Sequence, residues 1–322
     1  MTDRWRFRWS AIALALLSAL PASTVFAHGA VRSQPTAATL ITGWELDPFF
    51  IIAAGLTCWI YALGVRRVAR EHPKSPFPRK RIIYFYSGIA TLVIALMSPL
   101  ASYDTQLFSV HMWQHMLIVM VAAPLLLLGT PITLALRAAT PQFRRSTLLP
   151  ILHSRALRIL SFPVLAWLLF TATMWATHFL PLYNASLEHV WLHRLEHFWF
   201  ITAALFFWWQ VIGVDPTPWR MPHPVRMLYV FLQMPQNSFL ALAIYGSDTP
   251  IYKHYATLPR TWGPGPLLDQ QLAGITMWVF GDLLFLISCG FVAYGWVKHE
   301  EMEGKRQDRQ QERAAQAARI TP

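Results

Sequence analysis

Seven apolar runs are each long enough to cross a lipid bilayer, and this feature limits the possible folds more than any other. A helix needs about 20 mainly apolar residues to cross about 30 Å of hydrocarbon, where only helices and closed barrels satisfy every backbone polar group. Hydrophobic residues make up 55% of the chain and charged residues 13%, a charged share too low for an ordinary soluble domain. We therefore predict an all-α, polytopic helical membrane protein with seven transmembrane helices. These runs begin near Phe49, Ile82, Val110, Ile159, His193, Met227 and Gly274.

The first 27 residues have the pattern of a secretory signal peptide. Three arginines precede a short apolar stretch, and Val25-Phe26-Ala27 provides a cleavage site. The alternative is an uncleaved anchor, which would form an eighth span. The expected domains are a signal peptide (1–27), a seven-helix transmembrane domain (28–297) and a cytoplasmic tail (298–322).

Lysine and arginine are distributed unevenly between the two sides that these spans define. Twenty lie in the segments 66–81, 137–158, 215–226 and 298–322, and only four lie on the opposite side. Basic loops stay in the cytoplasm, so we expect a multi-pass protein of a bacterial inner (cytoplasmic) membrane, with a periplasmic mature N-terminus and a cytoplasmic C-terminus. The net charge of +11 then indicates contact with membrane lipids, not with nucleic acid.

Histidines and methionines converge at the periplasmic ends of the third, fourth and fifth predicted helices. The third span opens with a histidine pair and a methionine pair, each spaced four residues apart and therefore on one helical face. The fifth opens with three histidines and Glu196 within an arc of about 100°. Imidazole and thioether groups suit copper, and thioethers favour Cu(I) in particular. The predicted metal ligands are His111, Met112, His115, Met116, His178, His189, His193 and His197.

Two further spans carry polar residues at a similar depth. The seventh begins with Asp269-Gln270-Gln271, and the sixth contains Met234-Pro235-Gln236-Asn237, where the proline is expected to break the helix. Asp282, near mid-membrane, either carries protons or pairs with a polar neighbour. A single histidine at a membrane interface is more often a hydrogen-bonded helix end than a ligand, and methionine often fills gaps in cores. Two histidine pairs at matching depth favour a metal or haem site over that interpretation.

One motif indicates a different chemistry. Residues 193–197 (His-Arg-Leu-Glu-His) match the H-x-x-E-H pattern of inverted zinc peptidases, in which two histidines bind zinc and a glutamate is the base. Those enzymes are large and soluble, whereas this helix continues directly into the bilayer. We therefore disfavour zinc hydrolysis and do not expect an enzyme.

The motifs together resemble the CtaG family, the membrane assembly factors of caa(3)-type cytochrome c oxidase. The resemblance covers nearly the whole mature chain, from about Leu46 to Trp296. It implies a seven-helix protein that matures the oxidase by supporting copper delivery to the catalytic subunit, with cytochrome c oxidase subunits and a periplasmic copper chaperone as partners. The motifs are 107–116 (LFSVHMWQHM), 124–131 (PLLLLGTP), 188–197 (EHVWLHRLEH), 234–236 (MPQ) and 269–278 (DQQLAGITMW).

Our interpretation is a metallochaperone whose histidine and methionine residues bind copper transiently. Two alternatives stay open from the sequence. A haem b group held by one histidine from the third helix and one from the fifth would make an electron carrier. A metal-free cluster would instead form a scaffold that holds an unassembled oxidase subunit.

Overall fold

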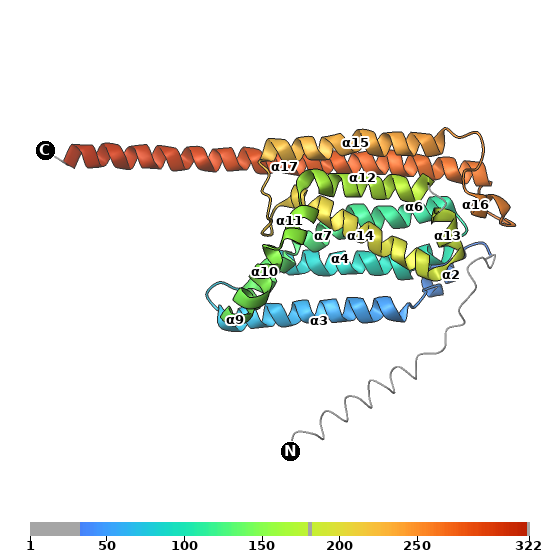
Figure 1. Ribbon diagram of the computed structural model, residues 1–322, viewed down its shortest axis with the longest axis horizontal. Helices are drawn as coiled ribbons and strands as arrows, with labels where there is room; N and C mark the ends of the chain where they lie inside the picture. The colour runs from blue at the N-terminus through green and yellow to red at the C-terminus, as the bar shows by residue number, and fades with distance from the viewer. Residues whose placement is uncertain (1–32, 180–181, 321–322) are drawn as a thin grey trace, which may run out of the picture.

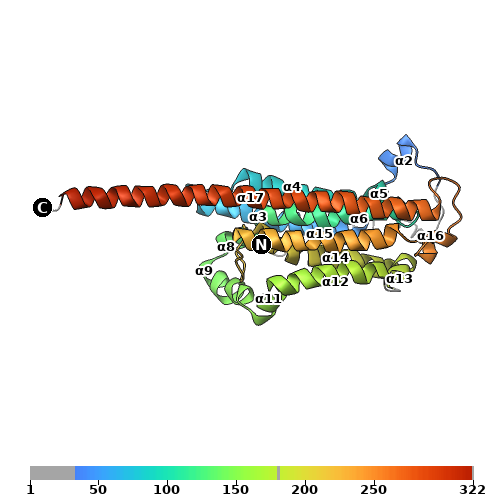
Figure 2. The same cartoon turned by 90° about the horizontal axis from the view of Figure 1, so that it is seen from above.

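Six helical segments of the described chain are long and apolar enough to cross a membrane, and they lie side by side in an elongated bundle (Figures 1 and 2). The computed structural model describes residues 33–179 and 182–320, and within them it contains helices and loops but no strand. The predicted signal peptide and its cleavage site at Ala27 lie outside the described residues. The six segments are α3 (Pro48–Glu71), α4 (Arg79–Met97) with α5 (Pro99–Tyr103), α6 (Phe108–Met116) continuing through η1 (Leu117–Ala122) and α7 (Ala123–Leu128) into α8 (Pro131–Ala138), α14 (Val190–Ile212), α15 (His223–Tyr245) and α17 (Pro266–Ile320).

The prediction of an all-α, multi-pass membrane protein is confirmed, and the seventh span stays a prediction. Its counterpart is α12 (Pro163–Phe179), which has 17 residues and would therefore cover about 25 Å at 1.5 Å per residue. This helix packs in the bundle against α14 and α15 (Figure 1).

Short helices close the two ends of the bundle. At one end lie α9 (Pro141–Phe143), η2 (Arg144–Leu148), α10 (Leu149–Leu152) and α11 (Arg155–Leu160), and α17 leaves the bundle there (Figure 1). We call this the basic end, because the lysine- and arginine-rich segments gather there. The opposite end carries α2 (Ala37–Thr42), α13 (Leu182–Glu188) and α16 (Lys253–Thr257); we call it the histidine end, because α6 and α14 begin there.

Local sequence explains where several helices begin. Proline is the first residue of α3, α5, α8, α12 and α17, a position where its fixed φ fits and its missing N–H is not needed. The side chain of Asp47 caps α3 by accepting a hydrogen bond from the Phe49 N–H at 2.9 Å. Ser98 caps α5 in the same way through the Leu100 N–H at 3.2 Å.

The prediction that Pro235 breaks its helix was wrong, because α15 continues through this residue as one helix. Just beyond it, the Asn237 amide and the Ser238 hydroxyl donate to the two Asp282 oxygens on α17, at 2.9 and 2.5 Å. Asp282 therefore pairs with polar neighbours. Gly281 permits this close approach, since a Cβ there would lie 2.7 Å from the Asn237 Nδ2.

An aromatic core holds the main bundle together, and a smaller cluster attaches α3. In the main core, the buried Trp208 indole donates to the Val119 carbonyl in η1 at 2.8 Å. In the smaller cluster, Tyr61 of α3 stacks on Phe85 of α4 with ring centroids 3.7 Å apart, and its hydroxyl donates to the Gly129 carbonyl at 2.8 Å. Most of α3 beyond these contacts is exposed, as expected for a helix that faces lipid.

Candidate metal centre

Five of the predicted histidines gather between α6, α12 and α14 at the histidine end. His111 and His115, one turn apart on α6, are 0% and 3% exposed, and their ring centroids are 4.1 Å apart. From α14, the His193 ring lies 5.8 Å from that of His111, and the His197 ring lies 5.9 Å from that of His115. His178, near the end of α12, places its ring 6.3 Å from His115. We call these five residues the histidine cluster.

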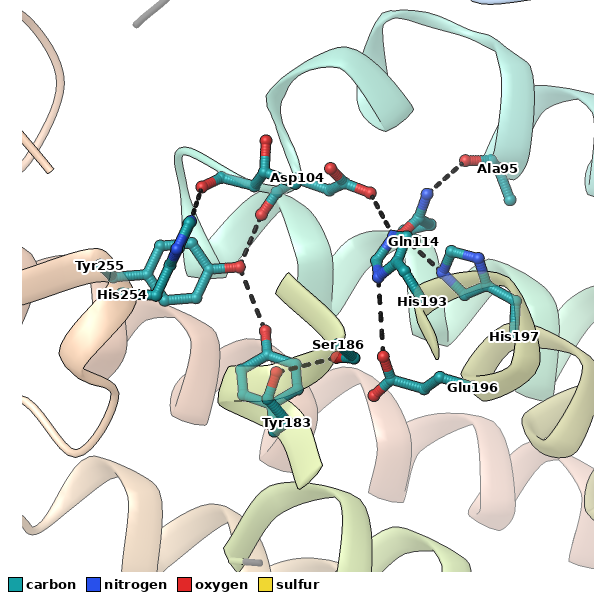
Figure 3. A network of polar contacts seen from close by, with 11 residues as sticks. Ala95, Asp104, Gln114, Tyr183, Ser186, His193, Glu196, His197, His254 and Tyr255 are labelled. Carbon is teal, nitrogen blue, oxygen red and sulfur yellow. Dashed lines mark hydrogen bonds and ion pairs between the residues drawn. The ribbon is translucent and has the colours of Figure 1, made fainter. Parts of the chain in front are cut away.

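Two buried carboxylates complete this cluster (Figure 3). The Nε2 atom of His193 lies 3.2 Å from Oδ2 of Asp104, which directly follows α5, and its Nδ1 lies 3.6 Å from Oε2 of Glu196. Nitrogen and oxygen atoms come within 4.8 Å of one another in two groups, Asp104/His111/His193 and His111/His115/Glu196. Ligand atoms about 2 Å from a tetrahedral metal lie about 3.3 Å apart, so small side-chain rotations would bring either group to a metal. Both groups combine α6 with residues of other elements, and neither contains His197 of the zinc-peptidase-like motif.

The rings of His111 and His115 are the least satisfied polar groups of the cluster. All four of their nitrogen atoms are buried and have no hydrogen-bond partner within the described part of the chain. Burying a polar group without a partner costs about 1–3 kcal/mol. These two side chains are therefore poorly explained as structural core residues, and their nitrogen atoms have the lone pairs that a metal ligand needs.

The other histidines of the cluster are oriented by hydrogen bonds. His197 donates through Nε2 to Oε1 of Gln114, whose own amide donates to the Ala95 carbonyl at 3.0 Å. His178 donates through Nδ1 to the Met174 carbonyl at 2.6 Å. Such bonds fix the ring orientation and tautomer, leaving the second nitrogen as an acceptor, which is the usual arrangement for a metal-binding imidazole.

The start of α6 is fixed by a carboxylate from the last span. Leu107, at the N-cap of α6, provides no side-chain cap. Asp269 of α17, which is 0% exposed, instead accepts hydrogen bonds from the backbone N–H groups of Phe108 and Ser109 at 2.8 and 3.1 Å and from the Ser109 hydroxyl at 2.6 Å. Arg260 forms an ion pair with the same carboxylate at 3.1 Å. The helix turn that precedes His111 is thus held by a residue 160 positions away.

Tyrosines cover the cluster on the side of α13 and α16 (Figure 3). The Tyr255 hydroxyl donates to the Asp104 carbonyl at 2.6 Å and lies 3.1 Å from the Tyr183 hydroxyl. Tyr252 donates to the carbonyl of His178 at 3.2 Å. Burial raises the pKa of the Tyr183 and Tyr255 hydroxyls well above the usual value, so both stay neutral. This cover shields the cluster from water with groups that add no charge.

Three of the predicted ligands lie apart from the five rings. His189 is exposed at the N-cap of α14. Met112 is buried in the apolar core, and Met116 lines a separate pocket deeper in the bundle.

Asp104, Gln114 and the tyrosines were not predicted from the sequence as part of the site. Glu196 was placed on the histidine face of its helix but not among the ligands. The sequence signal for Asp104 was its place directly after the second span, at the same depth as His111. On its own, that position indicates only surface charge.

Comparison with known proteins identifies the family. The family model of the cytochrome c oxidase caa3 assembly factor (Caa3_CtaG) matches residues 59–299, which include the entire cluster and its supporting contacts. The chain belongs to this family. The resemblance inferred from the sequence motifs is therefore confirmed.

Relatives in mycobacteria are much longer than this chain. Uncharacterized proteins of Mycobacterium bovis and Mycobacterium tuberculosis are each 32% identical over 302 residues, and one of Mycobacterium leprae is 28% identical over 292 residues. These alignments cover 91%, 91% and 88% of this chain but 45%, 45% and 44% of the relatives. The chain thus spans about half the length of the curated relatives it matches. No solved structure matches the chain significantly.

Proposed function

We propose that this family member assists the assembly of a caa3-type cytochrome c oxidase by binding copper at the histidine cluster and passing it to the catalytic subunit. Copper is the cargo, and the role is not enzymatic. Family membership supports a role in oxidase assembly, and the histidine cluster supports copper as the ion that is delivered.

The location follows from the separation of charge between the two ends. Twenty lysines and arginines belong to segments of the basic end, and such segments stay in the cytoplasm. With the protein in a bacterial inner membrane, the histidine cluster then faces the periplasm. A periplasmic copper chaperone could supply the ion there, and the oxidase subunit could receive it within the same membrane.

The observation that carries the proposal is the pair of partnerless buried rings, His111 and His115. Imidazole nitrogen and carboxylate oxygen are ligands suited to Cu(II), and Glu196, Asp104 and His193 lie within reach. His193 must give up a contact with Asp104 or Glu196 to bind an ion. That loss subtracts from the binding free energy and keeps the ion exchangeable, as a delivery protein requires.

The test is Cu(II) binding by the detergent-purified, full-length protein, measured by elemental analysis, electron paramagnetic resonance and the visible absorption spectrum. We expect about one Cu(II) per chain with nitrogen hyperfine couplings, and loss of this ion in a His111→Ala/His115→Ala variant. His189→Ala is the matched control, since it removes an exposed histidine from the same end and should retain the copper. Thermal melting of each variant checks the fold.

Other outcomes would replace the proposal with a different function. A Soret band in the purified protein would indicate a haem b carrier. A folded protein that binds no copper would indicate the metal-free scaffold, and the histidine variants should then lose co-purification with the oxidase subunit instead.

A further inference from the structure

A pocket lined in part by methionine side chains lies about one helical turn deeper in the bundle than the histidine cluster. Four methionines from α6, η1, α12 and α17 line it, and each is between 2% and 8% exposed. The pocket adjoins the cluster, because one of these methionines directly follows His115 and another accepts the hydrogen bond of His178 through its carbonyl. The four residues are Met116, Met120, Met174 and Met277, and we call the space between them the methionine pocket.

One wall of this pocket includes a π-helical segment, and another includes a proline within a continuous α-helix. Met120 belongs to η1, a π-helical segment, and such segments are rare and concentrate at functional sites. On the opposite wall, Gln233 and Gln236 of α15 line the pocket on either side of Pro235. A proline inside a helix removes one backbone hydrogen bond and displaces the carbonyl four residues before it. The π-helical segment and the proline therefore both occur where the bundle encloses the pocket.

Hydrogen bonds between the helices keep these walls in place. The Thr171 hydroxyl of α12 donates to Oε1 of Gln233 at 2.9 Å, which joins α12 to α15. The Asn237 amide of α15 donates to the backbone carbonyl of Met277 at 3.0 Å, which joins α15 to α17. The thioether groups have no part in these two bonds.

We propose that the methionine pocket is a binding site for Cu(I), distinct from the histidine cluster above it. Thioethers are soft, neutral ligands that select Cu(I) over harder cations. Methionine also serves as a gap-filler in cores, but here the four side chains border a pocket instead of filling it. The proposal rests on the copper-handling function proposed above in one respect only, which is that this function supplies the ion. The copper enters the pocket already reduced, as Cu(I).

The site also has a source of compensating charge. A monovalent cation in a low-dielectric interior needs a nearby negative group. Asp282 lies one side chain away, since its carboxylate accepts from the amide of Asn237, which itself lines the pocket. The carboxylate thus lies behind a residue that lines the pocket, on the side where a negative group would favour a cation.

The experiment is Cu(I) binding under anaerobic, reducing conditions, with competition against a chromophoric Cu(I) chelator and X-ray absorption at the copper edge. The wild-type protein should show sulfur scattering in addition to nitrogen scattering. A Met116→Leu/Met120→Leu/Met174→Leu/Met277→Leu variant should lose the sulfur shell and its Cu(I), because leucine preserves shape but has no donor atom. Met221→Leu, a buried methionine in the core but outside this pocket, is the matched control and should behave as the wild type.

The outcomes separate this proposal from the previous one. If the His111→Ala/His115→Ala variant keeps the sulfur shell while the quadruple methionine variant loses it, the methionine pocket stands, whatever the Cu(II) result. If the Cu(I)-loaded wild-type protein shows no sulfur scattering, the pocket is core packing and the proposal fails, even where the cluster binds Cu(II). If sulfur scattering persists in the folded quadruple variant, the ligand assignment is wrong.

Discussion

Replacing His111 with leucine should make the metal-free protein more stable. His111 is completely buried, and neither of its ring nitrogens has a hydrogen-bond partner within the described residues. In His111→Leu, two buried polar atoms are exchanged for apolar ones of similar overall size. Each unsatisfied buried group costs about 1–3 kcal/mol, and loss of the ring contacts with His115 and Tyr183 offsets part of the gain. We expect a net gain of about 1–2 kcal/mol in the free energy of unfolding.

The opposite sign is expected for His197→Leu, which is the matched control. His197 donates a hydrogen bond to Gln114, so the substitution removes this bond and leaves the Gln114 oxygen without its donor. The expected cost is about 1–2 kcal/mol. Denaturant titration of both variants in detergent, followed by tryptophan fluorescence in copper-free buffer, measures the two values.

The contrast between the variants is the test. A structural core histidine should lose stability when replaced, whereas a residue retained for ligand binding gains it, as is usual for functional sites. If His111→Leu loses more than about 1 kcal/mol, the ring is structural and the reasoning about partnerless nitrogens is refuted.

Four further predictions concern contacts that cap helices, cover the cluster or pack helices against one another. Asp269→Ala should lower the free energy of unfolding by about 3–5 kcal/mol, because it leaves Arg260 beside two uncapped N–H groups. It should also weaken Cu(II) binding at least about tenfold. Copper affinity unchanged within twofold would contradict this prediction. Asp215→Ala removes an equivalent cap at the basic end, where this carboxylate accepts from the N–H groups of Ile132 and Thr133, so unfolding should show a loss of about 1–2 kcal/mol with copper affinity retained. Tyr255→Phe should cost about 1 kcal/mol and raise amide hydrogen exchange in α16, and unchanged exchange would argue against the proposed cover. Gly281→Val should cost about 1–3 kcal/mol in thermal or denaturant unfolding, because its Cβ meets the pinned amide of Asn237, while Gly290→Val, at an open position, should be nearly neutral.

Much of the fold was predictable because the bilayer leaves few choices. Apolar length alone located α3, α4 and the third span to within a few residues, and the histidine spacing identified one face on each of α6 and α14. Equal depth in the membrane then brought five histidines together correctly, His178 of α12 included. Helical periodicity and depth are both local properties of the chain, so the sequence displays them directly.

The remaining parts of the site depend on tertiary contacts that no local pattern contains. Asp104 reaches His193 only because α5 and α14 meet at the histidine end. A helical wheel places Met116 beside the histidines, but the rotation of α6 in the bundle directs it to another pocket. The π segment η1 and the unbroken passage of α15 through Pro235 depend on neighbouring helices in the same way.

The hydrogen bonds from Asp269 to the start of α6 form only late in the synthesis of this protein. Ser109 leaves the ribosome 160 residues before the carboxylate that fixes it, and His193 follows His111 by 82 residues. At about 5–20 residues per second, the first turn of α6 has to wait about 8–32 s for its cap. A chain arrested before its last span has been synthesised therefore carries the histidines of the cluster without the carboxylate that positions α6. Only a chain that includes α17 can hold the cluster in the geometry described above.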